Sequence, residues 1–210
     1  MEIELKYRIE NKEQREQIWE DSTLLAMEEP GSRDILAMSA AYFDTEDLVL
    51  SKHEIALRTR QEGTRYVGTL KRRDNDVDEK SGLYVREELN VPLPSEASFF
   101  SPDPTIFVES EEGKKLMAIL AGKPLVCIFE TVFTRWKLRI DSGLCICEIS
   151  LDEGEIIAGE NRAPISEFEI ELYSGPQEEM FKIGESLKEK YNLFPESRSK
   201  YARGRALAYK

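Results

Sequence analysis

The sequence has only one histidine, His53, among its 210 residues. This scarcity excludes a metal site or a catalytic triad that needs further histidines, and a lone histidine is usually structural. Cysteines are also few, and Cys127, Cys145 and Cys147 lie in apolar stretches typical of strands. We interpret them as reduced, packed thiols of a cytoplasmic protein and not as a disulfide framework or a zinc site.

Long apolar runs are missing too. No stretch approaches the ~20 apolar residues that a membrane span requires, and the charges that directly follow Met1 exclude a signal peptide. The chain also lacks a glycine-rich phosphate loop, internal repeats and low-complexity tracts. Its formal net charge of −12 repels nucleic acid and anionic membranes. With 40% hydrophobic and 33% charged residues, the composition predicts one soluble domain over residues 1–210.

The first ten residues alternate between charged and apolar side chains. Glu2, Glu4 and Lys6 share one face of the predicted strand, and Leu5 and Tyr7 lie on the other. At a rise of about 3.3 Å per residue, the two carboxylates are roughly 7 Å apart, which allows them to share one or two metal ions. Two simpler interpretations stay open: a strand with one wet face, or a helix in which Glu2 and Lys6 form an i, i+4 pair.

Similar alternation recurs along the chain, and turn residues separate the alternating segments. We expect eight strands, at residues 1–10, 35–45, 53–62, 64–73, 83–91, 125–140, 144–151 and 165–173. We expect helices at residues 12–21, 110–121, 176–191 and 199–209. Because most strands are joined by hairpins, the pattern predicts an α+β fold built on an eight-stranded antiparallel β-barrel, or tunnel. Helices would cover its apolar outside, so the charged faces would line its lumen.

The charged faces hold two sets of side chains with complementary chemistry. The cations are Lys6, Arg58, Arg60, Lys71, Arg86 and Arg135, and the acids are Glu2, Glu4, Glu88, Glu148, Asp152, Glu169 and Glu171. Arg and Lys bind phosphate oxygens, and carboxylate clusters suit Mg²⁺ or Mn²⁺. Together they predict a small polyanion bound with a metal ion. Taken alone, Arg58 and Arg60 could be solvated charges, and Asp152 a turn former beside Gly154.

The ordered set of these residues resembles the signature of the CYTH superfamily, also called the triphosphate tunnel metalloenzymes. The similarity begins with Glu2-x-Glu4-x-Lys6 and covers essentially the whole chain. The further matching motifs, in the family's order, are Tyr42-Phe43-Asp44-Thr45, Leu57-Arg58-Thr59-Arg60, Thr69-Leu70-Lys71, Arg86-x-Glu88, Arg135, Asp152, Glu169-Ile170-Glu171 and Ser199-Lys200-Tyr201. The pair His53-Glu54 departs from the small turn residue expected before Arg58.

The resemblance implies an eight-stranded tunnel that binds a triphosphate together with divalent metal ions. By position, it assigns the phosphates to Lys6, Arg58, Arg60, Lys71, Arg86, Arg135 and Lys200. It assigns the metal to Glu2, Glu4, Asp152, Glu169 and Glu171, with Glu88 as a further candidate. The catalytic centre would then consist of Glu2, Glu4, Lys6 and Glu171.

Within this family, we expect a triphosphatase that uses Mg²⁺ or Mn²⁺ and hydrolyses inorganic tripolyphosphate by direct attack of water. Three alternatives stay open: a class IV adenylyl cyclase that makes cyclic AMP from ATP, a thiamine or nucleoside triphosphatase, and a module that binds polyphosphate without turnover. The acids argue against the last, because a pure anion-binding site gains nothing from them. Since no helical polyphosphate-associated domain follows, we expect the catalytic module alone, as a cytoplasmic monomer or homodimer without nucleic acid or membrane partners.

Overall fold

The structure is a computed structural model that describes residues 2–72, 77–78, 82–86, 88–94, 96 and 99–209, except for the side chains of residues 77, 78 and 86. Its strands are β1 Glu2–Arg8, β2 Asp34–Asp44, β3 Ile55–Glu62, β4 Arg65–Arg72, β5 Val77–Asp78, β6 Leu83–Arg86, β7 Glu88–Pro92, β8 Val126–Asp141, β9 Ile146–Ala158, β10 Asn161–Ser174 and β11 Phe194–Pro195. Its helices are α1 Lys12–Trp19, α2 Ser22–Met27, α3 Val49–Lys52, the 3₁₀ helix η2 Pro104–Phe107, α4 Glu111–Leu120, α5 Gln177–Tyr191 and α6 Lys200–Ala208.

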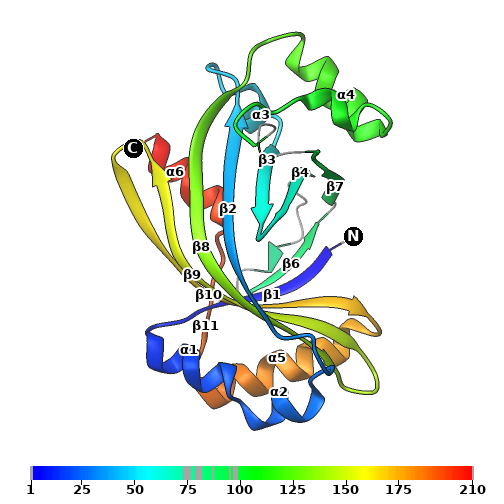
Figure 1. Ribbon diagram of the computed structural model, residues 1–210, viewed down its shortest axis with the longest axis vertical. Coiled ribbons are helices and arrows are strands. Elements are labelled where there is room, and N and C mark those ends of the chain that lie inside the picture. The colour runs from blue at the N-terminus through cyan, green and yellow to red at the C-terminus, as the bar shows by residue number, and fades with distance from the viewer. Residues whose placement is uncertain are drawn as a thin grey trace.

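The strands form one antiparallel sheet that curls around an interior (Figure 1). Its order is β5-β6-β1-β10-β9-β8-β2-β3-β4-β7, with β11 beside β1. The consecutive strands β6 and β7 lie near opposite ends of this path, because β6 pairs with β1 and β7 pairs with β4. Of the eleven strands in the described residues, the short β5 and β11 were not predicted, and β6 and β7 both overlap the strand predicted over residues 83–91. The expected α+β fold with a curled antiparallel sheet is thereby confirmed.

The helix predicted over residues 12–21 is present as α1, which begins at Lys12 and ends two residues early, at Trp19. A second helix, α2, begins at Ser22 and was not predicted. Asp21 explains the restart, because its carboxylate accepts hydrogen bonds from the backbone N–H groups of Thr23 and Leu24. Such N-capping satisfies backbone donors that a helix start otherwise leaves without partners.

The strand expected to end at Leu151 continues to Ala158 in β9. Asp152 and Gly154 therefore lie within a strand, and the interpretation of Asp152 as a turn former was wrong. A Cβ atom at Gly154 would come within 2.2 Å of the Val132 carbonyl oxygen on β8. Glycine at this position allows β8 and β9 to approach closely, which is one of the recognised reasons for glycine inside a strand.

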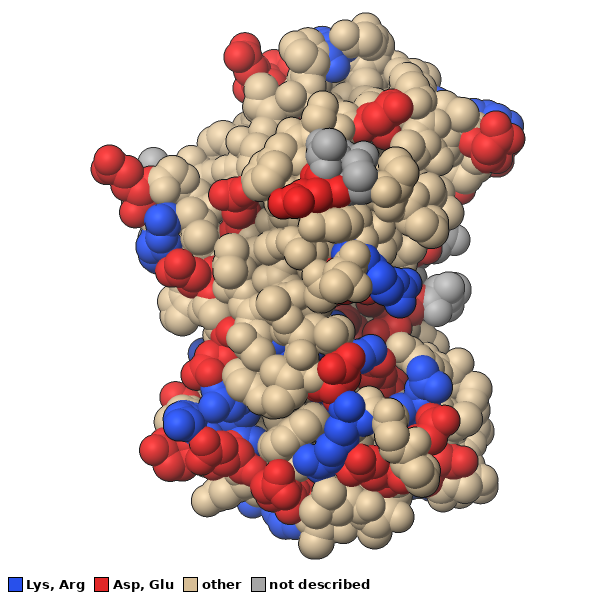
Figure 2. All heavy atoms as spheres, in the orientation of Figure 1, with Lys and Arg blue, Asp and Glu red and all other residues tan. Residues whose placement is uncertain are grey.

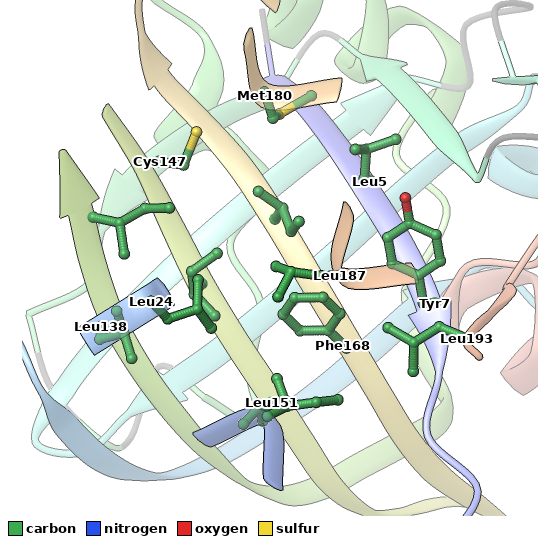
Figure 3. Packing of buried hydrophobic residues seen from close by; sticks show 14 of the residues in the cluster. Leu5, Tyr7, Leu24, Leu138, Cys147, Leu151, Phe168, Met180, Leu187 and Leu193 are labelled. Atoms are coloured by element: carbon green, nitrogen blue, oxygen red, sulfur yellow. The ribbon is translucent and has the colours of Figure 1, made fainter. Parts of the chain in front are cut away.

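The outer face of β1, β8, β9 and β10 is apolar and is covered by α1, α2 and α5 (Figure 1), whereas η2 and α4 pack against β2, β3 and β4. Figure 3 shows Leu5, Tyr7 and Phe168 of the sheet packed beneath Met180 and Leu187 of α5, and all of these side chains are buried. Over this part of the molecule, acidic and basic side chains are intermingled on the outer surface (Figure 2). The alternation along β1 and β10 thus directs apolar residues outward to the helices and charged residues inward. Among the described residues, no helix is long and apolar enough to cross a membrane.

The last helix, α6, packs on the inner side of the sheet against β8, β9 and β10. Leu207 belongs to a buried cluster with Met38, Tyr42 and Phe129. The approach is close at Gly204, where a Cβ atom would lie 2.2 Å from the ring of Phe129. Helix α6 therefore fills part of the interior, and its first residue, Lys200, lies beside the space that remains.

Candidate active site

The interior of the curled sheet contains a cavity of about 870 Å³. The predicted site residues that line it are Glu2, Glu4, Lys6, Arg58, Arg60, Lys71, Glu88, Arg135, Glu169, Glu171 and Lys200. The backbone of Arg86 pairs with that of Glu2, but the Arg86 side chain lies outside the described part of the chain. Asp152 has no exposed surface and lies behind the described cavity lining. The structure thus brings most of the predicted residues together around one cavity.

Strand β3 contributes the most prominent cations of the lining. Arg58 and Arg60 alternate with the buried Leu57 and Thr59, so both guanidinium groups face the cavity. The Nε–H groups of both arginines are buried and have no hydrogen-bond partner in the described protein. Burial, together with the charge of Arg58, lowers the pKa of Arg60 to about 10. Buried donors without partners are unfavourable, so this wall is suited to an anion.

Lys71 of β4 contacts a carboxylate of β1, Glu2, and also Glu88, which forms an ion pair with Arg58. The Lys71 ammonium lies 2.9 Å from Glu2. Burial acts to raise the pKa of Glu88, but Arg58 and Lys71 outweigh it and hold that pKa well below its usual range. Burial raises the pKa of Glu2, and the carboxylates of Glu4 and Glu88 add to this despite Lys71. Glu88 is therefore the more firmly ionised of the two carboxylates that share Lys71.

Three carboxylates form a line across neighbouring strands, and we call them the acidic row: Glu4 on β1 lies opposite Glu171 on β10, which lies opposite Glu148 on β9. Side chains in such positions have Cβ atoms about 5 Å apart, and like charges there repel. Glu4 lies 3.3 Å from Lys6, and Glu148 lies 3.0 Å from Lys137. Glu171 has no ion pair with any described residue. Burial, reinforced by neighbouring carboxylates, raises its pKa to about 8.

Asp152, Glu167 and Glu169 form a second group, which we call the paired trio; oxygen atoms of these carboxylates lie within 4.8 Å of one another. The ammonium of Lys200 lies 2.8, 2.5 and 2.9 Å from the three in that order. Arg135 donates two hydrogen bonds of 2.7 Å to Asp152 and one of 2.8 Å to Glu169. Burial acts to raise the pKa of Glu169, but Lys200 and other cations hold it well below its usual range.

Both groups offer carboxylate oxygens, the ligands that Mg²⁺ and Mn²⁺ prefer. They differ in what lies between the carboxylates. In the paired trio the ammonium of Lys200 takes that position, so a metal ion would have to displace a buried, hydrogen-bonded cation. In the acidic row Glu171 has no cationic partner among the described residues, and it faces the cavity. Among the described residues, the paired trio is the group whose carboxylate oxygens lie within 4.8 Å of one another. Glu171 is the carboxylate best placed to accept a divalent cation without displacing a lysine, with Glu4 and Glu148 opposite it on the neighbouring strands.

Sequence reasoning missed several residues of the site. Glu148 was grouped with the acids but not assigned to the metal, and Lys137, which lines the cavity, was not assigned at all. The signal for both is their place on alternating strands, but only the register shows what they face. Tyr42 also lines the cavity, and its hydroxyl accepts a 3.3 Å hydrogen bond from Arg58. For Glu167 the sequence contains no signal beyond its place in the segment 167–172, in which glutamates alternate with apolar residues.

Comparison with known proteins agrees with this architecture. The protein named inorganic triphosphatase of Haemophilus influenzae is 33% identical over 180 residues, which are 83% of this chain and 47% of that protein. The chain therefore spans about half the length of that relative. A Hippeastrum protein, described as a candidate adenylyl cyclase with a dominant triphosphatase activity, has a similar structure with a TM-score of 0.70. It is 19% identical, and the match covers 98% of this chain and 96% of that one.

A candidate adenylate cyclase of Bacillus halodurans has the same fold, with a TM-score of 0.56 and 19% identity. That match covers 97% of this chain and 96% of the other. At such identities the structural likeness shows the fold alone. The family itself is established by sequence, because the CYTH domain model matches residues 1–204. The chain belongs to the CYTH domain family.

Proposed function

We propose that the protein is a metal-dependent triphosphatase whose substrate is inorganic tripolyphosphate. The observation that carries this proposal is the division of one cavity into a cationic part and an acidic part, each with groups that are not fully satisfied. Arg58 and Arg60 contact Glu88 and Glu62, but their buried Nε–H groups have no partner among the described residues. Glu171 has no ion pair with a described residue, and its pKa is raised. A triphosphate would satisfy the first part and a divalent cation the second. The 33% identity to a protein named inorganic triphosphatase supports the same function.

In this proposal the cations of the cavity hold the phosphate chain. Arg58, Arg60 and Lys71 would bind phosphoryl oxygens from β3 and β4, and Lys6 of β1 and Arg135 of β8 also line the cavity. Guanidinium groups suit this role because their donors match two phosphate oxygens at once. These contacts would orient the chain, offset its negative charge and favour the charge distribution of phosphoryl transfer.

The acidic row and Glu2 would hold Mg²⁺ or Mn²⁺, which polarises a phosphoryl oxygen and activates water. Water would then attack the terminal phosphoryl group directly. The described cavity lining contains neither cysteine nor histidine. Its serines are Ser51, which is hydrogen-bonded to Tyr201, Ser199, which caps α6, and Ser197. No histidine of the described lining lies beside Ser197 to act as its base, which favours hydrolysis without a phosphorylated enzyme.

The decisive experiment measures phosphate release and cyclic AMP formation on tripolyphosphate, ATP and thiamine triphosphate, with Mg²⁺, with Mn²⁺ and with a chelator. We expect metal-dependent phosphate release, greatest on tripolyphosphate. Arg58→Ala should raise KM and lower kcat, and Glu171→Gln should mainly lower kcat and the response to metal. Loss of one charge-assisted contact should lower kcat/KM roughly ten- to a hundredfold.

Arg162→Ala and Glu155→Gln are matched controls, because these residues form an exposed ion pair on the same sheet. Neither should change turnover appreciably. Full activity in excess chelator would refute the metal dependence. Dominant formation of cyclic AMP from ATP would identify a cyclase instead, and binding of tripolyphosphate without any turnover would identify a non-catalytic binding module.

A further inference from the structure

Lys200 has no donor left for a phosphate in this structure. A lysine ammonium has three N–H groups, and Lys200 lies within hydrogen-bonding distance of Asp152, Glu167 and Glu169. Of these acceptors only Glu169 contributes to the described cavity lining. The ammonium is therefore held partly from the cavity side and partly from behind the wall. Any contact between Lys200 and a substrate must compete with these carboxylates.

Glu167 is the acceptor that decides this competition most directly. It is completely buried, and its two oxygens contact different cations. Oε2 accepts a hydrogen bond of 2.5 Å from Lys200, and Oε1 accepts a hydrogen bond from Arg203. Lys200 and Arg203 are three residues apart, so they lie on the same side of α6. The negative charge of Glu167 is thus divided between two cations of one helix.

Arg203 is itself held behind the wall. Its Nη1 donates to the Pro164 carbonyl at 3.2 Å, and its buried Nε–H has no partner among the described residues. It does not belong to the described cavity lining. Loss of Arg203 would leave Glu167 with Lys200 as its remaining cation among the described residues. A buried carboxylate then attracts that cation more strongly, since a buried charge without a partner is costly.

From this arrangement we propose that Glu167 and Arg203 are positioning residues that set how readily Lys200 turns to a substrate phosphate. The inference rests on the proposed binding of a triphosphate in the cavity. With Arg203 present, Glu167 is satisfied and Lys200 can release one donor to the substrate. Without Arg203, Lys200 stays on Glu167. Without the charge of Glu167, one donor of Lys200 is free.

A purely structural role would have a different signature. The pair could simply anchor α6, which is also held by Leu207 and by the close contact of Gly204 with Phe129. In that case every substitution in the pair would weaken the helix, and binding would fall with stability whether or not Lys200 was present. The positioning role instead requires that Arg203 act through Glu167 and Lys200. Double-mutant cycles separate these two possibilities.

The test is calorimetric binding of tripolyphosphate in excess chelator, where the proposed activity is silent. We expect Arg203→Met to weaken binding roughly tenfold. The double variant Glu167→Gln with Arg203→Met should bind within about threefold of the wild type, because the unpaired carboxylate is gone. In a Lys200→Met background, Arg203→Met should have no further effect on binding. Arg203→Lys should keep most of the wild-type affinity, and it serves as the reporter if Arg203→Met does not fold.

Arg15→Met is the matched control. Arg15 is also buried and is paired with Glu153, but the Arg15 guanidinium stacks on Trp136 and does not contribute to the described cavity lining. This variant should lose stability without losing affinity. Unchanged binding by Arg203→Met, failure of the double variant to recover, or an equal loss in the Lys200→Met background would overturn the positioning role. Absence of tripolyphosphate binding by the wild-type protein would instead refute the proposed function on which the inference rests.

Discussion

The acidic row and the paired trio occupy the same side of the same sheet, yet their environments differ. Both contain carboxylates placed opposite one another on neighbouring strands: Glu4, Glu171 and Glu148 in the row, Glu167 and Asp152 in the trio. In the trio, Lys200 contacts every carboxylate, and Arg135 and Arg203 add further ion pairs. In the row, Lys6 and Lys137 each contact one end, and Glu171 between them has no ion pair with a described residue.

This difference separates acids that organise the site from acids that are available to a ligand. A buried carboxylate that is ion-paired and hydrogen-bonded is stable where it is, and removing it leaves buried cations uncompensated. A partly buried carboxylate surrounded by other carboxylates is destabilising until a cation arrives. Proximity of three acids is therefore insufficient to identify a metal site. The charges already present among them decide whether they are available.

The largest effect should come from Asp152→Asn in the paired trio. This substitution removes a fully buried charge that Arg135 holds with two hydrogen bonds and Lys200 holds at 2.8 Å. Breaking a buried ion pair typically costs about 3–5 kcal/mol. We expect the free energy of unfolding, measured by urea denaturation, to fall by this amount. Asp34→Asn, at an exposed position on β2, should change the free energy of unfolding by less than about 0.5 kcal/mol. Similarly small changes in the free energy of unfolding for both variants would show that the carboxylates of the paired trio do not stabilise the fold.

A smaller effect, of opposite sign, should come from Glu171→Gln in the acidic row. Burial and neighbouring carboxylates raise the pKa of Glu171 to about 8, from a value of 4.5 in the unfolded chain. Between these pH values the folded state retains a proton that the unfolded chain has released, so wild-type stability falls as pH rises. The stability of the variant does not fall in this way. Its free energy of unfolding should exceed that of the wild type by up to a few kcal/mol above pH 8 and should equal it near pH 4.5.

Urea denaturation in a chelator at several pH values measures this difference. Added Mg²⁺ should then stabilise the wild type at alkaline pH and should have much less effect on Glu171→Gln, because the variant has lost a proposed ligand. Parallel pH profiles for the two proteins would show that Glu171 is not under electrostatic strain. Glu155→Gln, which is exposed, provides the comparison for removal of a carboxylate without burial.

The smallest effect should come from Lys137→Met, which removes the cation at one end of the acidic row. Lys137 lies 3.0 Å from Glu148, and 29% of its side chain is exposed, so solvent screens the pair. We expect a loss of about 1 kcal/mol or less, greater at pH 9 than at pH 5 because the row is then more fully ionised. Lys123→Met, which breaks the exposed pair with Asp47, should show little of this pH dependence. An equal loss at both pH values would contradict the assignment of Lys137 to the row.

Much of the fold could be predicted because strand alternation is a local property. The alternation of Glu4 and Lys6 with Leu5 and Tyr7 correctly indicated which side chains face the helices and which face the interior. The same alternation identified Arg58 and Arg60. Predictions failed where local signals were ambiguous. Asp21 lies at the end of the predicted helix but caps the start of a second one, and Gly154 resembles a turn residue although it permits close packing of two strands.

The sequence by itself determined the residue types that face inward, because a period of two sorts side chains by face without reference to the rest of the chain. It also determined the family, through the order of motifs from Glu2 to Lys200. Only the tertiary structure decided which acids are neutralised. Cross-strand register places Glu148 opposite Glu171, and helix α6 brings Lys200 into the paired trio from more than 30 residues away along the chain. Charge pairing depends on distances of a few ångströms between distant segments, and no local pattern encodes those distances.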